Sequence, residues 1–150
     1  EFWTSDEAFR LKDNEYILFV GNDGNRDANL LIDIAKAMPE YQFIFVSKIP
    51  ELQDIELPNV KLISGSWGDK ALTDSELRKI YNNARLTIIP LKESSQPSGQ
   101  SVALQSISMN TPVLITKTKG FWDSTSFIDS ERRSLNCNST PDLPSPLLLV

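Results

Sequence analysis

The sequence has no histidine and a single cysteine, Cys137, among its 150 residues. Histidine is the commonest general base and the commonest metal ligand, so this inventory excludes a Ser-His-Asp triad and a zinc site. One cysteine cannot form an internal disulfide and fits a reducing compartment. We therefore expect no metal, no cofactor and a cytoplasmic location.

Long apolar runs and an excess of positive charge are also missing. No run of about 18 apolar residues occurs, which argues against a transmembrane segment, and no basic stretch precedes an apolar one near the start, which argues against a signal peptide. The formal net charge of −5 argues against a nucleic-acid partner. The chain begins with Glu1 rather than Met, which predicts that it is processed or cut from a longer protein.

What the sequence does contain is a regular alternation of two patterns. Five short, nearly continuous apolar runs are typical of parallel strands covered on both faces. These runs span residues 16–21, 42–47, 60–65, 85–91 and 112–118. Between them, apolar stripes with helical spacing predict helices over 27–39, 73–84 and 98–110. Residues 48–59 are bounded by prolines and are too short for a confident helix prediction.

This order predicts an α/β fold, a three-layer α/β/α Rossmann-like domain with a parallel sheet of about five to six strands. We expect a charged lead-in at 1–14, the Rossmann-like domain at 15–130 and an irregular tail at 131–150. The tail has three prolines and no periodicity, and it is either loose or packed locally. A truncated or non-native end is a further interpretation of it.

Ligands of open α/β sheets bind beyond the carboxyl ends of the strands, where three predicted loops gather. The first loop, 21–27, has two glycines without the GxGxxG spacing of a dinucleotide site. It is either a simple strand-to-helix turn capped by Asp27 or a phosphate site with Arg26 aimed into the cleft. The second loop, 64–70, contains Trp67, which either packs or stacks on a nucleobase.

The third loop leads into the predicted helix 98–110. If Ser98 caps this helix, the amides that follow it form an anion site at the positive end of the helix dipole. Gly99 then keeps side-chain bulk away from the anion. Gln105 lies one turn beyond Ser101, where its amide can donate to and accept from vicinal hydroxyls. The alternative is an ordinary capped helix with a solvated glutamine.

Four segments together resemble a known family. They are VGNDGNRD, LPNVKLISG, LRKIYNNARLTIIPL and QPSGQSVALQSISMNTPVLITKTKG, and the resemblance covers about residues 15–130. They are similar to the carboxyl-terminal, donor-binding domain of retaining glycosyltransferases with the two-Rossmann-domain (GT-B) fold, of the group 1 type. The resemblance implies one half of a GT-B fold and a hexosyltransferase-like enzyme. Its substrate would be a UDP- or GDP-sugar, its acceptor would bind to a missing amino-terminal domain, and the fragment alone would be inactive.

The resemblance also implies roles for single residues. Arg26 matches the family's phosphate-binding lysine and would stabilise the leaving diphosphate, with Gly21 and Asn22 beside it. Gln105 matches the glutamate that binds the ribose hydroxyls. The donor diphosphate would bind at the helix start and the base near the second loop, which implicates Ser66, Trp67, Ser98, Gly99, Gln100, Ser101 and Val102.

Several positions depart from the family pattern. Pro97 stands where the first glutamate of a Glu-x7-Glu motif is expected, so the contact with the donor sugar falls to another group such as Glu93. Asn22 stands near a second expected cation, and Gln105 lacks the charge of glutamate. These departures leave open the alternative that the chain is a non-catalytic Rossmann-like binding or interaction module. The glycine spacing and the lack of an acidic residue after 42–47 argue against an NAD-dependent dehydrogenase.

Overall fold

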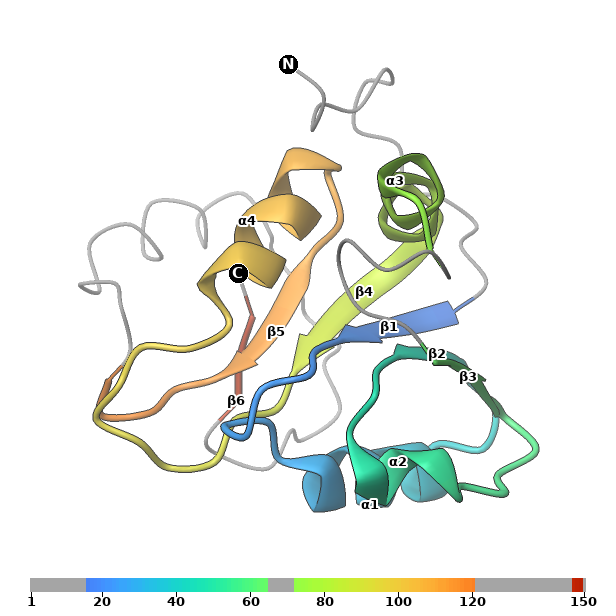
Figure 1. Ribbon diagram of the computed structural model, residues 1–150, viewed down its shortest axis with the longest axis horizontal. Helices are drawn as coiled ribbons and strands as arrows, with labels where there is room; N and C mark the ends of the chain where they lie inside the picture. Colours follow the sequence, from blue (N-terminus) through green and yellow to red (C-terminus); the bar gives the residue numbers. More distant parts are fainter. Residues whose placement is uncertain (1–15, 65–71, 121–146, 150) are drawn as a thin grey trace, which may run out of the picture.

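The computed structural model describes residues 16–64, 72–120 and 147–149, and they form one mixed sheet with helices on both faces (Figure 1). The strands are Tyr16–Val20 (β1), Gln42–Val46 (β2), Val60–Ile63 (β3), Ala84–Ile89 (β4), Val113–Thr116 (β5) and Leu147–Leu149 (β6). The helices are Ala28–Ala37 (α1), Pro50–Gln53 (α2), Asp74–Asn82 (α3) and Gln100–Ser108 (α4). None of these helices has the length and apolar character needed to cross a bilayer.

The sheet has the strand order β3-β2-β1-β4-β5-β6. Strands β1 to β5 are parallel to their neighbours, and β6 pairs antiparallel with β5. The parallel α/β architecture predicted from the apolar runs is therefore confirmed. Strand β3 forms one edge and β6 the other, and Lys61 at the β3 edge is exposed.

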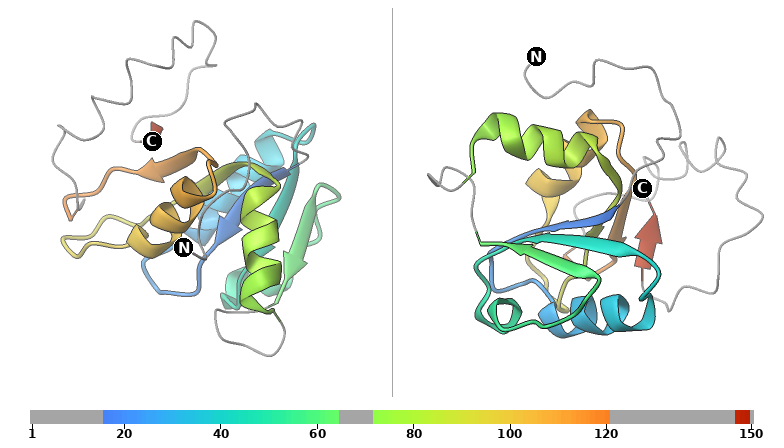
Figure 2. Two further views of the ribbon diagram at one scale, coloured as in Figure 1. Left: turned by 90° about the horizontal axis from the view of Figure 1, so that it is seen from above. Right: turned by 90° about the vertical axis from the view of Figure 1, so that its right-hand side faces the viewer.

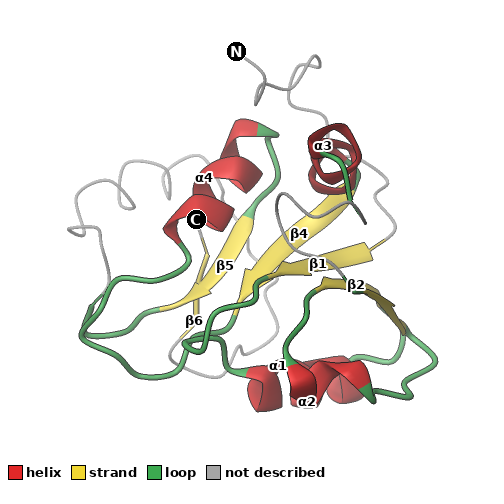
Figure 3. Ribbon diagram, viewed as in Figure 1, coloured by secondary structure: helices red, strands yellow, loops and turns green. Residues whose placement is uncertain are grey.

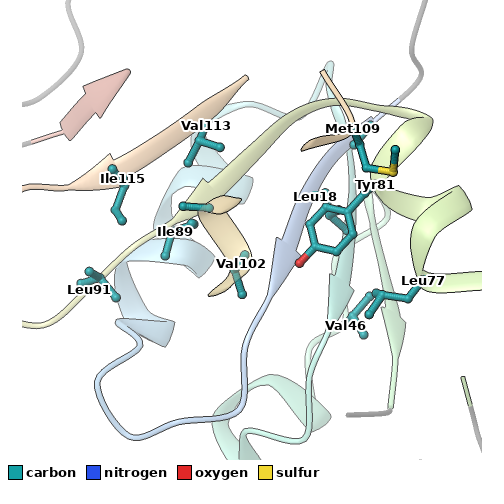
Figure 4. Packing of buried hydrophobic residues seen from close by; sticks show 12 residues of the cluster. Leu18, Val46, Leu77, Tyr81, Ile89, Leu91, Val102, Met109, Val113 and Ile115 are labelled. Atoms are coloured by element: carbon teal, nitrogen blue, oxygen red, sulfur yellow. The ribbon is translucent and has the colours of Figure 1, made fainter. Parts of the chain in front are cut away.

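The helices make three layers with the sheet in the middle. Helices α1 and α2 cover one face and α3 and α4 the other, which the colouring of Figure 3 and the right-hand view of Figure 2 make visible. On the first face Phe19, Phe43 and Phe45 make edge-to-face contacts, with ring centroids 5.9 Å and 6.1 Å apart. On the second face the fully buried ring of Tyr81 lies in a cluster with Leu18 (Figure 4). Burying side chains of this size contributes roughly 1.5–3 kcal/mol each.

Polar residues define where three of the helices begin or end. The Asp27 carboxylate accepts a hydrogen bond from the Leu30 amide at 3.0 Å, so the predicted cap of α1 is confirmed. Thr73 and Glu76 form the predicted reciprocal capping box of α3. After α4, Asn110 takes a left-handed φ of 55°, as expected of a residue that stops a helix before proline.

Three expectations need correction. Helix α4 is not capped by Ser98: its N-cap is Gly99, with φ 82° and no side-chain hydrogen bond. Residues 48–59 contain a one-turn helix, α2, because Pro50 is preorganised for the first helical position. The tail predicted to be irregular contains β6, since β5 offers a strand edge with which a short apolar run can pair. The lead-in 1–14 lies outside the described residues.

The strand order fixes where a ligand can bind. From β1 the chain proceeds to β2 and β3 on one side, and it then crosses to β4 and β5 on the other. The helices that follow β1 and β4 cover opposite faces of the sheet, so the switch point lies between these two strands. A crevice at this position is the usual binding site in open α/β sheets.

Candidate functional site

The loops that follow β1 and β4 are joined to one another by backbone hydrogen bonds. The Asp27 amide donates to the Pro90 carbonyl at 3.0 Å, and the Lys92 amide donates to the Asn25 carbonyl at 2.8 Å. Arg26 lies between these two bonds and forms an isolated β-bridge with Leu91. The backbone of Arg26 is therefore held at the carboxyl ends of both central strands.

The side chain of Arg26 is the strongest chemical feature of this region. Only 5% of it is exposed, and its Nη2 is 3.0 Å from Oδ2 of Asp23. Its Nε and Nη1 atoms are buried and have no hydrogen-bond partner in the described part of the chain. Burial lowers the pKa of the guanidinium and the Asp23 carboxylate opposes that change, but arginine keeps its proton in proteins. Unpaired N–H groups of a buried cation are costly, so they indicate an acceptor that the protein does not supply.

Two glycines make room for this guanidinium. A Cβ atom at Gly21 would lie 2.4 Å from Arg26 Nε, and one at Gly99 would lie 3.1 Å from Nη1 and 2.9 Å from Ile89 Cγ2. The expectation that Gly99 keeps bulk away from an approaching anion stays a prediction. Its missing side chain faces the protein interior, and its left-handed φ favours glycine independently.

Helix α4 begins directly beside Arg26. The first amide with a partner in the helix is that of Ala103, which donates to the Gly99 carbonyl at 2.9 Å. The amides of Gln100, Ser101 and Val102 come before it and have no intrahelical acceptor. No side chain in the described part of the chain caps them. These amides and the helix dipole favour a negative charge at this point.

A cavity of about 250 Å³ opens between α3, α4 and the loop after β1. Six of the residues predicted for donor binding line it: Gly21, Asn22, Arg26, Ser101, Val102 and Gln105. Sequence reasoning missed two of its acidic residues, Asp23 and Asp74. Among the described residues that line the cavity, Arg26 is the one cation and these two aspartates are the anions.

Gln105 is 7% exposed, so the interpretation of α4 as a helix with a solvated glutamine is wrong. Its Oε1 accepts a hydrogen bond of 3.1 Å from the Tyr81 hydroxyl. Burial raises the pKa of Tyr81, which keeps that hydroxyl neutral. Because the oxygen of Gln105 already has a partner inside the protein, its amide N–H groups are what it offers to a ligand.

The other predicted residues do not line this cavity. Glu93 is exposed, and its Oε1 accepts from the Lys119 amide at 2.9 Å. Pro97, on the approach to α4, and Gln100, its first residue, are exposed, and Ser98 is half-buried. Ser66 and Trp67 lie outside the described residues, so their predicted place near the base stays a prediction.

In comparisons with known proteins, no family model, no curated protein and no solved structure matches this chain. The fold and the site define the class of the molecule, a Rossmann-like α/β domain with a cavity at its topological switch point. The resemblance to glycosyltransferases stays a prediction.

Proposed function

We propose that this chain is the nucleotide-sugar donor-binding domain of a glycosyltransferase that transfers a sugar from a UDP- or GDP-sugar to an acceptor. The observation that carries the proposal is the buried guanidinium of Arg26, which lies beside the start of α4. Among the described residues, its Nε and Nη1 have no acceptor and no side chain caps that helix. A diphosphate is the part of such a donor that supplies acceptor oxygens to both groups at once.

The residues that line the cavity suggest how they would act. Arg26 and the amides at the start of α4 would bind the diphosphate and stabilise the charge that it gains as the sugar leaves. Gln105 would donate from its amide to a ribose hydroxyl oxygen. The cavity is slightly smaller than the roughly 300–1,000 Å³ of typical ligand sites, so it suits the diphosphate and ribose rather than the whole donor.

Transfer would need more than this domain. In the proposed enzyme an amino-terminal acceptor domain closes over the donor, which excludes water and strengthens the interactions with the leaving group. Without that closure the diphosphate stays partly solvated, where hydrogen bonds contribute little net free energy. We therefore expect weak donor binding and no sugar transfer by these 150 residues alone.

A non-catalytic binding or interaction module is the second candidate. It is favoured by the Asp23 carboxylate, which already pairs with Arg26. It is also favoured by the charges of the described residues that line the cavity, where two aspartates accompany one arginine. A protein of this kind keeps the fold and the buried cation but binds no nucleotide.

Calorimetric titration with UDP- and GDP-sugars, with a transfer assay on the same samples, tests the proposal. We expect a Kd in the high-micromolar range, or about −5 to −6 kcal/mol. Gln105→Ala should weaken binding by about 1 kcal/mol, the usual value of a neutral hydrogen bond. Gln42→Ala, an exposed glutamine at the opposite end of β2, serves as the control. Binding of no nucleotide would favour the non-catalytic module, and transfer by the chain alone would contradict the need for a second domain.

A further inference from the structure

The carboxylate of Asp23 links the two loops of the cavity entrance. Its Oδ2 pairs with Nη2 of Arg26 at 3.0 Å, and its Oδ1 accepts from the Asn25 amide at 3.0 Å. The Ser98 hydroxyl, in the segment that leads into α4, lies 3.4 Å from the same Oδ1. A carboxylate thus occupies the place between the buried cation and the approach to α4.

This carboxylate and its cation differ in their freedom to move. The Asp23 side chain is 46% exposed, whereas the Arg26 side chain is 5% exposed. Asp23 can therefore turn toward water and be solvated there, at little cost. Arg26 cannot, because its backbone is bonded between two loops and Gly21 and Gly99 enclose its guanidinium. If the ion pair opens, it is Asp23 that leaves.

Asp23 also satisfies only part of Arg26. It pairs with Nη2, and Nε and Nη1 have no partner among residues 16–64, 72–120 and 147–149. A ligand with several charged oxygens can bond to these nitrogens and to the amides of α4 together, which one carboxylate does not do. Such a ligand gains contacts when it displaces Asp23. A singly charged carboxylate ligand only exchanges one ion pair for another of the same kind.

We propose that Asp23 is an internal counter-ion that neutralises Arg26 in the empty site and is displaced by a multiply charged oxyanion, a diphosphate. For a nucleotide sugar this inference rests on the proposed function, and for the diphosphate group itself it does not. Asp23 lowers the affinity for all anions, so that only ligands with enough charge and enough oxygens to displace it bind well. It is thus a specificity-determining residue of the site.

Asp74 offers a matched control for the charge of Asp23. It also lines the cavity, from the first turn of α3, but it forms no ion pair with Arg26 among the described residues. Asp74→Asn therefore measures the long-range effect of removing one negative charge. Asp23→Asn removes the same charge together with the ion pair, and its amide oxygen can still accept from the Asn25 amide.

The experiment is a calorimetric titration of both variants and the unmodified chain with inorganic pyrophosphate at low ionic strength. We expect Asp23→Asn to bind about tenfold more tightly than the unmodified chain and Asp74→Asn to gain less than about threefold. The gain should vanish when Arg26→Met is added to Asp23→Asn. Equal or weaker binding by Asp23→Asn, an equal gain in Asp74→Asn, or no pyrophosphate binding by any of them would overturn the inference.

A second measurement uses the unmodified chain, so it does not depend on how a variant folds. On saturation with pyrophosphate, the carboxyl carbon resonance of Asp23 should shift toward that of a solvated aspartate. An unchanged Asp23 resonance in the saturated protein would overturn the displacement.

Titration with UDP under the same conditions separates the two proposals. Tighter pyrophosphate binding by Asp23→Asn without any nucleotide binding would support the counter-ion and contradict the glycosyltransferase. Nucleotide binding that is the same in the unmodified chain and in Asp23→Asn would support the glycosyltransferase and contradict the counter-ion.

Discussion

The hydroxyl of Tyr81 in α3 lies 3.1 Å from Oε1 of Gln105 in α4, and both side chains are buried. This bond crosses between two helices on the same face of the sheet. It holds the carbonyl oxygen of the Gln105 amide against Tyr81, so the amide N–H groups are left for the cavity. Tyr81 is therefore a positioning residue for Gln105.

Tyr81→Phe should both destabilise the fold and weaken ligand binding. Loss of one buried hydrogen bond is expected to lower the free energy of unfolding by about 1 kcal/mol. Nucleotide affinity should fall severalfold, because the Gln105 amide can then rotate. Denaturation and titration measure the two effects. Tyr16→Phe is the control: the Tyr16 hydroxyl donates to the Ile80 carbonyl at 2.8 Å and is not among the residues that line the cavity. Equal loss of affinity in both variants would contradict the role of Tyr81.

Arg26→Met should separate stability from binding. A buried cation with two unpaired nitrogens costs desolvation energy that an apolar side chain of similar length does not. We expect the free energy of unfolding to stay the same or rise by about 1 kcal/mol, while anion binding is lost. Urea denaturation and titration with pyrophosphate test this. The exposed Arg85, whose guanidinium lies 5.6 Å from the centre of the Tyr41 ring, provides the control Arg85→Met, which should bind normally. A loss of more than about 2 kcal/mol in Arg26→Met would show that the cation is structural.

Gly21→Ala should act through Arg26. The added methyl group would meet Arg26 Nε at 2.4 Å, so the guanidinium must move. Pyrophosphate affinity should fall in Gly21→Ala toward the loss expected of Arg26→Met, because both changes remove the guanidinium from its place in the site. Gly24→Ala, where a Cβ would meet no atom within 4 Å, is the control. Equal pyrophosphate affinity in Gly21→Ala and Gly24→Ala would disprove the steric link.

The capping box of α3 predicts a pH dependence of stability. Hydrogen bonds from the Thr73 amide, and then from its hydroxyl, lower the pKa of Glu76. A carboxyl with a lower pKa in the folded state stabilises the fold above its unfolded pKa, and that contribution is lost as the pH falls through the folded pKa. The difference in Tm between the unmodified chain and Glu76→Gln should therefore be largest near neutral pH and shrink in acid. A difference that does not change with pH, or that matches the control Glu56→Gln, would contradict it.

Much of the fold follows from local sequence patterns. The five apolar runs are long enough and apolar enough to indicate buried parallel strands, and Asp27 and Thr73 cap helices by bonds that span three residues. Strand β6 could not be predicted in this way. Its three residues have no periodicity of their own and form a strand only by pairing with β5.

The candidate site was predictable only in part, because its decisive contacts join distant residues. The Tyr81–Gln105 bond spans 24 residues, and the Ser98–Asp23 contact spans 75. An aspartate in a polar loop gives no sequence signal that it will pair with a buried arginine three residues later. Serine is preferred at the N-cap, which favoured Ser98. The N-cap of α4 is instead Gly99, which has a left-handed φ.

The edge of the sheet formed by β3 bears on whether copies of this protein associate. An exposed strand edge can extend its hydrogen bonding into another molecule, which is a common start of aggregation. Here the edge is four residues long and carries the exposed side chain of Lys61. Two copies that paired through this edge with Lys61 opposite Lys61 would bring two ammonium groups close together along a very short ladder. The β3 edge is thus protected against self-assembly by its charge and by its length.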